Sequence, residues 1–269
     1  MRSKVLFAAA MALALALMVA GITAPGAVKA APSTGLSGDE ILVKVDGIME
    51  AKATVMDAAM TTVGSNGTEK SSEMIIYTKK DAAGKARTLI RYLSPAADKG
   101  IGFLSLGSVD KMWMYLPKVE KLVRIAGSMV KQSMMNSDFS YEDLMDRANF
   151  AEYYSAQVVG NENIEGQNCY VLELKAKKGS AHYRQVKLWV RQDNFIPAKE
   201  EFYSGSGKLV KVSYQTDLAV MDGRTVPTKI VFKDLEQKGH QTVLTIKDIR
   251  FSAEVPERTF SLQYLEKGQ

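Results

Sequence analysis

The densest group of carboxylates in the chain is Asp138, Glu142, Asp143 and Asp146. Glu142 and Asp146 are one helical turn apart, so a helix would place them on one face, as a general acid–base pair or a metal site requires. Either chemistry also needs a partner base or a further metal ligand, and the sequence offers none nearby. We therefore expect a solvated acidic turn at the start of a helix, where the helix dipole favours negative charge.

The residue types that act as nucleophiles or metal ligands are sparse. The two histidines, His182 and His240, fall near the ends of predicted strands and outside any cluster with metal-ligand spacing. The single cysteine, Cys169, enters a predicted strand, where we expect a buried and inert thiol; alone it forms no intrachain disulfide. No Gly-x-Ser-x-Gly, P-loop or dinucleotide fingerprint occurs. The sequence therefore predicts a protein that is not an enzyme and uses no cofactor and no metal, with an ester hydrolase as the enzymatic alternative.

Methionine marks the most distinctive stretch of the chain. Six of the 14 methionines lie between Met112 and Met145, in the sequence MWMYLPKVEKLVRIAGSMVKQSMMNSDFSYEDLM. Methionine is flexible and polarizable, so such a density is typical either of an irregular core or of a surface that adapts to a soft apolar partner. Composition alone favours the core.

Residues 1–30 are expected to form a cleaved signal peptide. Two basic residues precede an apolar run from Val5 to Ile22, and Val28-Lys29-Ala30 fits a small-residue cleavage site. The alternative is an uncleaved membrane anchor, for which the run is at the short end of the usual length. No cysteine follows the run, so we do not expect a lipidated N-terminus.

The mature chain, residues 31–269, is expected to be weakly charged. The formal net charge of +5 for the whole sequence falls to +2 once Arg2, Lys4 and Lys29 leave with the signal peptide. Acidic and basic residues are interspersed, without the basic stripe that nucleic acid binding requires. The length suits one large domain or two small ones, and with no linker or repeat in the sequence one domain is the simpler account.

Hydrophobic periodicity predicts one opening helix and then a long antiparallel meander. Ser37 and Glu40 form a capping box before a helical pattern of apolar residues. The period then changes to two, and tight turn signals separate about ten expected strands. These signals are Asn66-Gly67, Ala83-Gly84, Gln192-Asp193-Asn194, Gly205-Ser206-Gly207, Asp222-Gly223 and Lys238-Gly239.

Three irregularities interrupt the meander. A phase change in the last apolar pattern predicts a β-bulge near Lys247-Asp248. A second capping pattern, Ser140-Tyr141-Glu142-Asp143, predicts a short helix in the middle of the chain. Pro256-Glu257 predicts a final helical turn that carries Phe260 and Leu262.

Several stretches carry a resemblance to a known family. Trp113–Pro117 is similar to a Trp-x-Tyr-Leu-Pro strand, and Lys121–Ile125 to the strand that pairs with it. Asn136–Leu144 is similar to a Gly-Ser-Asp-Phe-Thr-Tyr-Glu-Asp-Leu block, with asparagine for the glycine and serine for the threonine. Phe260–Leu265 is similar to the C-terminal segment of the same family. In these residues the chain resembles the outer-membrane lipoprotein-sorting protein family, which shares the fold of the carriers LolA and LolB.

The resemblance implies a mainly β, single-domain fold, in which an incomplete, half-open antiparallel β-barrel is covered by α-helices. Such a sheet has a hollow lined by alternate side chains, and each buried CH₂ contributes about 0.8 kcal/mol. The implied function is a periplasmic carrier or chaperone that binds acyl chains of lipids or lipoproteins in an apolar cavity, for transfer across the envelope, with residues 31–269 as the binding domain. We place the lining or lid of the cavity at Met112, Trp113, Met114, Tyr115, Leu116, Met129, Met134, Met135, Phe139, Leu144 and Met145.

The expected partners are a lipid or acylated lipoprotein as cargo and an inner-membrane RND-type exporter or lipoprotein-releasing transporter; the expected oligomeric state is a monomer. An alternative is a periplasmic sensor or regulator of envelope stress, because regulators share this fold, although they usually carry an additional C-terminal domain. Alternation leaves open whether Trp113 and Tyr115 face the cavity, or instead Met112, Met114 and Leu116.

Overall fold

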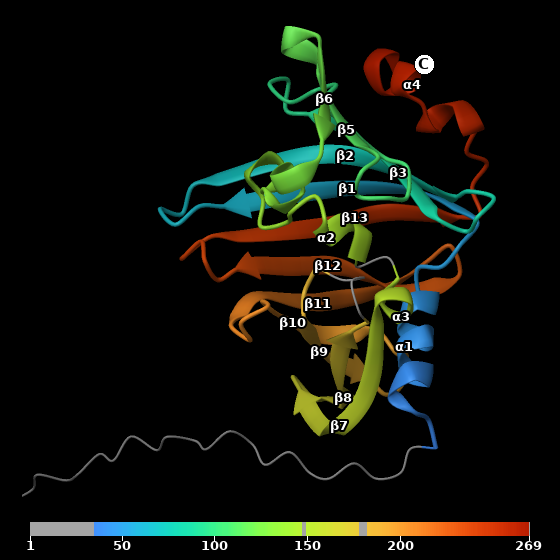
Figure 1. Cartoon of the computed structure of the whole chain (residues 1–269), viewed down its shortest axis with the longest axis vertical. Helices are drawn as coiled ribbons and strands as arrows, with labels where there is room; N and C mark the ends of the chain where they lie inside the picture. Colours follow the sequence, from blue (N-terminus) through green and yellow to red (C-terminus); the bar gives the residue numbers. More distant parts are fainter. Residues whose placement is uncertain (1–34, 147–148, 178–181, 269) are drawn as a thin grey trace, which may run out of the picture.

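A computed structural model of the chain describes residues 35–146, 149–177 and 182–268, so the expected signal peptide at residues 1–30 lies outside the described residues. All 13 strands belong to one antiparallel sheet, in the order β6-β5-β4-β3-β2-β1-β13-β12-β11-β10-β9-β8-β7 (Figure 1). The sheet is not closed into a barrel: β6 and β7 stand at its opposite ends. The predicted mainly β, half-open architecture with covering helices is confirmed.

The strands of the sheet are β1 (Ala53–Val63), β2 (Glu69–Lys80), β3 (Ala86–Ser94), β4 (Gly102–Ser105), β5 (Met112–Leu116), β6 (Lys121–Ile125), β7 (Tyr154–Ile164), β8 (Gln167–Ala176), β9 (Gln185–Arg191), β10 (Pro197–Tyr203), β11 (Leu209–Met221), β12 (Arg224–Asp234) and β13 (Gln241–Phe251). The helices are α1 (Gly38–Gly47), α2 (Asp143–Asp146), α3 (Phe150–Tyr153) and α4 (Leu262–Lys267), with 3₁₀ turns η1 (Pro117–Val119), η2 (Gly127–Lys131), η3 (Met134–Asn136) and η4 (Glu257–Phe260).

Local sequence signals determine where these elements begin and end. The predicted capping box starts α1: Ser37 Oγ accepts from the Glu40 N–H at 3.2 Å, and Glu40 Oε2 accepts from the Ser37 N–H at 2.7 Å. Each of the six predicted turns joins two strands that are neighbours in the sheet. The sheet has 13 strands rather than about ten, because a strand such as β4, of four residues, offers too few alternations to be recognised.

The predicted bulge lies in the pairing of β1 with β13. Asp57 pairs with Asp248 and Ala58 pairs with Ile246, so Lys247 has no position opposite it in β1. A bulge of this kind bends the strand and increases its twist. It falls near the middle of the sheet, where the two halves of the molecule meet.

The two faces of the sheet are covered by different segments. We call the inner face the one against which α1, α3 and residues 126–144 pack, and we call residues 126–144 the strap. In Figure 1 the strap descends from β6 across the front of β2, β1 and β13 to α2. The outer face over β3–β5 is covered by η4 and α4, where Leu265 and Phe260 pack on Leu89 and Leu104. Both predicted later helical segments, α2 and η4–α4, are therefore present and each covers a different face.

Candidate functional site

An apolar row crosses half of the inner face. Val123, Met114, Phe103, Ile90, Ile76 and Met56 are successive register partners from β6 to β1. Neighbouring strands lie about 4.8 Å apart, so the five steps of the row cover about 24 Å. One leaflet of a bilayer has a hydrocarbon thickness of about 15 Å. The row is therefore long enough to accompany an extended acyl chain.

The structure brings most of the predicted site residues to this face. One inner cluster contains Met112, Met114, Leu116, Met129, Met134, Met135 and Leu144. The methionine side of β5 therefore points toward the inner face. The same cluster includes Tyr92 and Met74 from β3 and β2, which the sequence did not single out.

The remaining predicted residues lie elsewhere. Trp113 and Tyr115 are on the outer face, in the cluster that packs under α4. Phe139 belongs to the other inner cluster, under α1 and α3, and stacks on Phe232 with ring centroids 4.5 Å apart. Met145 is in α2, and its side chain is outside the part of the chain that the structure describes.

The strap fills the hollow that the sequence led us to expect. Met134 is 3% exposed and Tyr141 6% exposed, and both pack against the inner face. The cavity between the strap and β1–β3 has a volume of about 10 Å³, which is room for a single water molecule. The expected open space for a fatty tail is therefore occupied, among the described residues, by the protein's own side chains.

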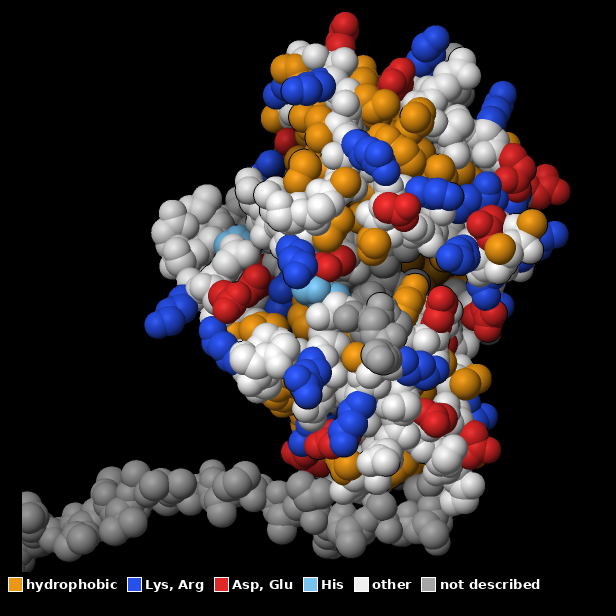
Figure 2. All heavy atoms as spheres, in the orientation of Figure 1, with side chains coloured by type: hydrophobic (Ala, Val, Ile, Leu, Met, Phe, Trp, Pro, Cys, Tyr) orange, Lys and Arg blue, Asp and Glu red, His pale blue; other side chains and the backbone are white. Residues whose placement is uncertain are grey.

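The edge of the strap leaves apolar surface partly uncovered. The half-buried residues packed against this inner cluster are Met56, Ile76, Leu116, Val123, Met129, Val130, Met135, Leu144 and Leu244. Figure 2 shows apolar side chains gathered on this side of the molecule, over its upper part. An uncovered apolar patch is typical of a surface that meets an apolar ligand or partner.

The acidic group in the strap is buried, so the expectation of a solvated acidic turn is wrong. Asp138 and Asp143 are each 1% exposed and Glu142 is 6% exposed. The strap crosses the sheet, and these carboxylates meet polar and basic groups that are distant in the sequence. The side chain of Asp146 is outside the described residues.

Asp138 ties the strap to the β12–β13 hairpin. Its Oδ2 accepts from Thr242 Oγ1 at 2.6 Å and lies 2.9 Å from His240 Nδ1. Its Oδ1 accepts from the Asp234 N–H at 2.9 Å. A buried carboxylate that is hydrogen-bonded on both oxygens fixes the segment that carries it.

Asp143 forms the second tie, at the start of α2. Lys211 Nζ lies 2.7 Å from its Oδ2, and Tyr183 donates to its Oδ1 at 2.6 Å. The Ser140 N–H donates to Asp143 and the Asp143 N–H donates to Ser140 Oγ, so the predicted capping pattern is confirmed. Next to it, His182 Nε2 lies 2.9 Å from Glu142 Oε1.

Each histidine thus faces one strap carboxylate, which the sequence did not reveal. In the described ranges there is no group of three or more His, Cys, Asp or Glu side chains placed to hold a metal ion. Cys169 is fully buried as predicted, and burial raises the pKa of its thiol to about 11.

Acid is expected to loosen the Asp143 tie. Burial alone raises the pKa of this carboxyl, but the Lys211 ammonium and the hydrogen bonds from Lys211, Tyr183 and the Ser140 backbone outweigh it, so that the pKa lies below 3.8. The pKa of Asp143 is lower in the closed strap than its ordinary value of 3.8, so the ionised carboxylate stabilises the closed strap at pH values above 3.8. That stabilisation is lost as the pH falls through the lower, folded-state pKa.

The measurement is the hydrogen-exchange protection factor of the Ser140 amide, which donates to Asp143. At pH values below 3.8, we expect the protection factor of the Ser140 amide to decrease. The protection factor of the Leu172 amide, in β8, is expected to stay unchanged. An equal loss at Leu172 would mean that the whole sheet opens rather than the strap.

A wider depression lies away from the strap. It has a volume of about 470 Å³ and is formed by the start of β1, the end of β2 and residues 252–256. Its Lys79 ammonium is already paired with Glu257 at 2.7 Å and donates to the Val255 carbonyl. Ala53 and Val255 belong both to its lining and to the outer cluster, so this depression lies on the outer face, opposite the strap.

Comparisons with known proteins identify the family. A family model with the description "Uncharacterized protein" matches residues 84–267. A DUF1329 family protein from Desulfovibrio piger is 26% identical, with a TM-score of 0.77 over 85% of this chain and 97% of that chain. A LolA superfamily protein from Nitrosomonas europaea is 29% identical, with a TM-score of 0.71 over 85% of this chain and 99% of that one.

A third solved structure shares the fold. It is described as an outer membrane lipoprotein-sorting protein domain from Vibrio parahaemolyticus, and is 22% identical, with a TM-score of 0.74 over 86% of this chain and 98% of that chain. A search of curated proteins gave no match. Across the described part of the chain, none of the helices has the length and apolar character needed to span a bilayer. From the match over residues 84–267 and these structural relatives, the chain belongs to a LolA-like family.

Proposed function

We propose that this protein is a periplasmic carrier that binds the acyl chains of a lipid or lipoprotein on the inner face, between the apolar row and the strap, and transfers them across the envelope. The observation that carries the proposal is the continuous apolar row from Val123 to Met56, edged by half-buried methionines. The similar proteins described as LolA superfamily and lipoprotein-sorting support a carrier-like fold.

Binding requires the strap to move. An acyl chain with about twelve buried CH₂ groups brings roughly ten kcal/mol of gross transfer free energy. Met134 and Tyr141 leave the inner face as the acyl chain arrives, so buried apolar area is exchanged rather than lost. The opposing free energy then comes mainly from the polar ties of Asp138 and Asp143. Methionines suit such an exchange, because one flexible side chain adapts to either partner.

The expected signal peptide supports a periplasmic location, as do the lipoprotein-sorting relatives. In that compartment a carrier with acyl cargo needs a membrane partner that loads or receives it. We assign this role to an inner-membrane RND-type exporter or lipoprotein-releasing transporter, the class of partner implied by the resemblance of Trp113–Pro117 and Asn136–Leu144.

Two adjacent isoleucines in β2 provide a matched test. Ile76 is on the apolar row of the inner face, whereas Ile75 packs in the outer cluster, and both are half-buried. We expect Ile76→Asn to weaken the binding of a fluorescent fatty acid by about tenfold or more, because a side chain of this size contributes about 1.5–3 kcal/mol when buried. Titration at constant protein concentration measures the effect.

The control is Ile75→Asn, which introduces the same amide into the same strand on the other face. It is expected to leave fatty acid binding unchanged. Equal weakening by both variants would show that the fatty acid does not use the inner face. Mass spectrometry of organic extracts from gently purified protein tests the proposal directly, because a carrier of this kind retains lipid; no lipid in the extract and no uptake of the fluorescent fatty acid would contradict it.

A further inference from the structure

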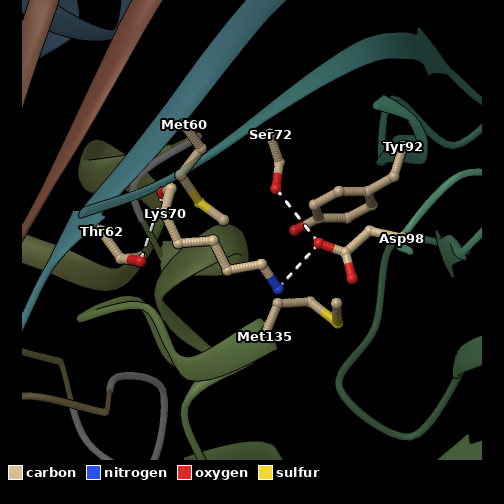
Figure 3. Close-up of a pocket in the computed structure, with 7 residues that line it drawn as sticks. All are labelled: Met60, Thr62, Lys70, Ser72, Tyr92, Asp98 and Met135. Atoms are coloured by element: carbon tan, nitrogen blue, oxygen red, sulfur yellow. Dashed lines mark hydrogen bonds and ion pairs between the residues drawn. The ribbon is translucent and has the colours of Figure 1, made fainter. Parts of the chain in front are cut away.

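Five of the seven residues that line the small cavity beneath the strap carry polar side-chain groups, although the cavity borders the apolar inner face. Figure 3 shows Lys70 and Ser72 of β2, Tyr92 of β3 and Asp98 of the β3–β4 connection converging on it, with Met135 of the strap beside them. Met60 continues its wall toward the apolar cluster. An amphiphile whose acyl chain lay on the inner face would bring its polar end to such a place.

The tyrosine in this cavity has an unsatisfied polar group. Tyr92 is 1% exposed, and its hydroxyl has no hydrogen-bond partner among the described residues. Buried polar atoms are nearly always paired, so an orphan that faces a cavity points to a missing partner. Burial raises the pKa of Tyr92, which keeps the phenol neutral and able both to donate and to accept.

The charged groups of the cavity differ in mobility. Asp98 is buried, and its Oδ2 lies 2.8 Å from Lys70 Nζ and accepts from Ser72 Oγ at 3.4 Å. The Lys70 side chain is 51% exposed on a flexible stem. Asp98, Ser72 and Tyr92 therefore form a fixed set of oxygen atoms, whereas the lysine ammonium is free to turn toward solvent without changing the sheet.

The strap is strained where it meets this cavity. Met135 has φ 52° and ψ 37°, and Asn136 has φ 60°, so two successive residues other than glycine are in the left-handed region. Backbone strain of this kind is concentrated at ligand-binding and switch segments.

We propose that the cavity is a head-group subsite for a phospholipid that carries both a primary ammonium and a phosphate, as phosphatidylethanolamine does. The lipid ammonium displaces the Lys70 ammonium from Asp98 and lies between Asp98 and the Tyr92 hydroxyl, where it donates to both. Lys70 turns outward and pairs with the lipid phosphate, so the ion pair of the free protein becomes two ion pairs with the ligand. This inference rests on the proposed function, since the acyl chains of the same lipid occupy the inner face.

The chemistry of the site disfavours the other common head groups. An anionic head without an ammonium brings negative charge toward the buried Asp98 carboxylate and offers no positive charge to replace the Lys70 ammonium. A quaternary ammonium has no N–H to donate, and its methyl groups need more room than the Lys70 ammonium occupies. The subsite therefore selects a head group that has both charges and N–H donors.

The test is competition among three phospholipids with identical acyl chains: phosphatidylethanolamine, phosphatidylcholine and phosphatidylglycerol. Each displaces a fluorescent fatty acid from the purified protein. We expect phosphatidylethanolamine to bind about tenfold more tightly than the other two, the usual scale for a charge-assisted hydrogen bond.

Two variants assign any preference to this cavity. Tyr92→Phe removes only the orphan hydroxyl and is expected to fold normally, and Asp98→Asn removes the charge; each is expected to reduce the preference to about threefold or less. Tyr77→Phe, at a half-buried tyrosine of the outer face, is the matched control and is expected to retain it.

Equal binding of the three lipids by the unmodified protein, or a preference that persists in both Tyr92→Phe and Asp98→Asn, would overturn the subsite and leave acyl-chain binding standing. If none of the lipids displaces the fatty acid, or the fatty acid itself does not bind, the proposed function fails together with the subsite.

Discussion

Asp143→Ala is expected to lower the free energy of unfolding by about 3–5 kcal/mol, the usual result of removing one partner of a buried ion pair. Lys211 is 8% exposed as a whole residue, and its ammonium would remain in the interior without its counter-ion. The Tyr183 hydroxyl and the Ser140 N–H would lose their acceptor at the same time. Urea unfolding followed by tryptophan fluorescence measures the loss.

Two further variants separate the ion pair from other causes. Asp143→Leu combined with Lys211→Met removes both charges and is expected to recover most of the lost stability, because no unpaired charge stays buried. Glu50→Ala breaks the exposed pair with Lys80 and is expected to change stability by less than about 0.5 kcal/mol. If Asp143→Ala and Glu50→Ala lowered the free energy of unfolding by similar amounts, the buried ion pair of Asp143 would contribute no more to stability than an exposed pair.

Locking the strap to the sheet is expected to abolish cargo uptake. The side chains of Asp138 and Thr242 meet at 2.6 Å, so Asp138→Cys with Thr242→Cys places two thiols close together across the strap and β13. In the oxidised form the strap is unable to leave the inner face, and we expect no binding of a fluorescent fatty acid. Reduction is expected to restore binding, because it releases the strap while the sheet is unchanged.

The native cysteine, Cys169, does not interfere with this disulfide. It is buried in a separate cluster with Val171, Trp189 and Ala198. The single variants Asp138→Cys and Thr242→Cys are expected to bind equally with and without reductant. Uptake that is as fast in the oxidised double variant as in the reduced one would mean that cargo reaches its site without movement of the strap.

The features that the sequence predicted correctly are local. The capping box of α1, the six hairpin turns and the bulge opposite Asp57 each depend on residues within a few positions of one another. The inward face of β5 was not predictable in this way. Met112 and Met114 pack under the strap while Trp113 and Tyr115 pack under α4, so both faces are apolar and alternation gives no direction.

The burial of the acidic block was not predictable from local pattern because its partners are distant in the sequence. Lys211 is 68 positions from Asp143, and Thr242 is 104 positions from Asp138. One local signal was present: Phe139 and Tyr141, which are both buried, lie between Asp138 and Glu142 in the sequence. Acidic residues interleaved with aromatics indicate a segment that packs against the protein, where each charge needs a partner.

The methionines of the inner face also make it sensitive to oxidants. Oxidation of a thioether gives a polar sulfoxide, which no longer favours contact with hydrocarbon. Met56, Met129 and Met135 are half-buried at the edge of the strap, whereas Met112 and Met74 are enclosed. Oxidation is therefore expected at the half-buried edge of the strap before the enclosed interior.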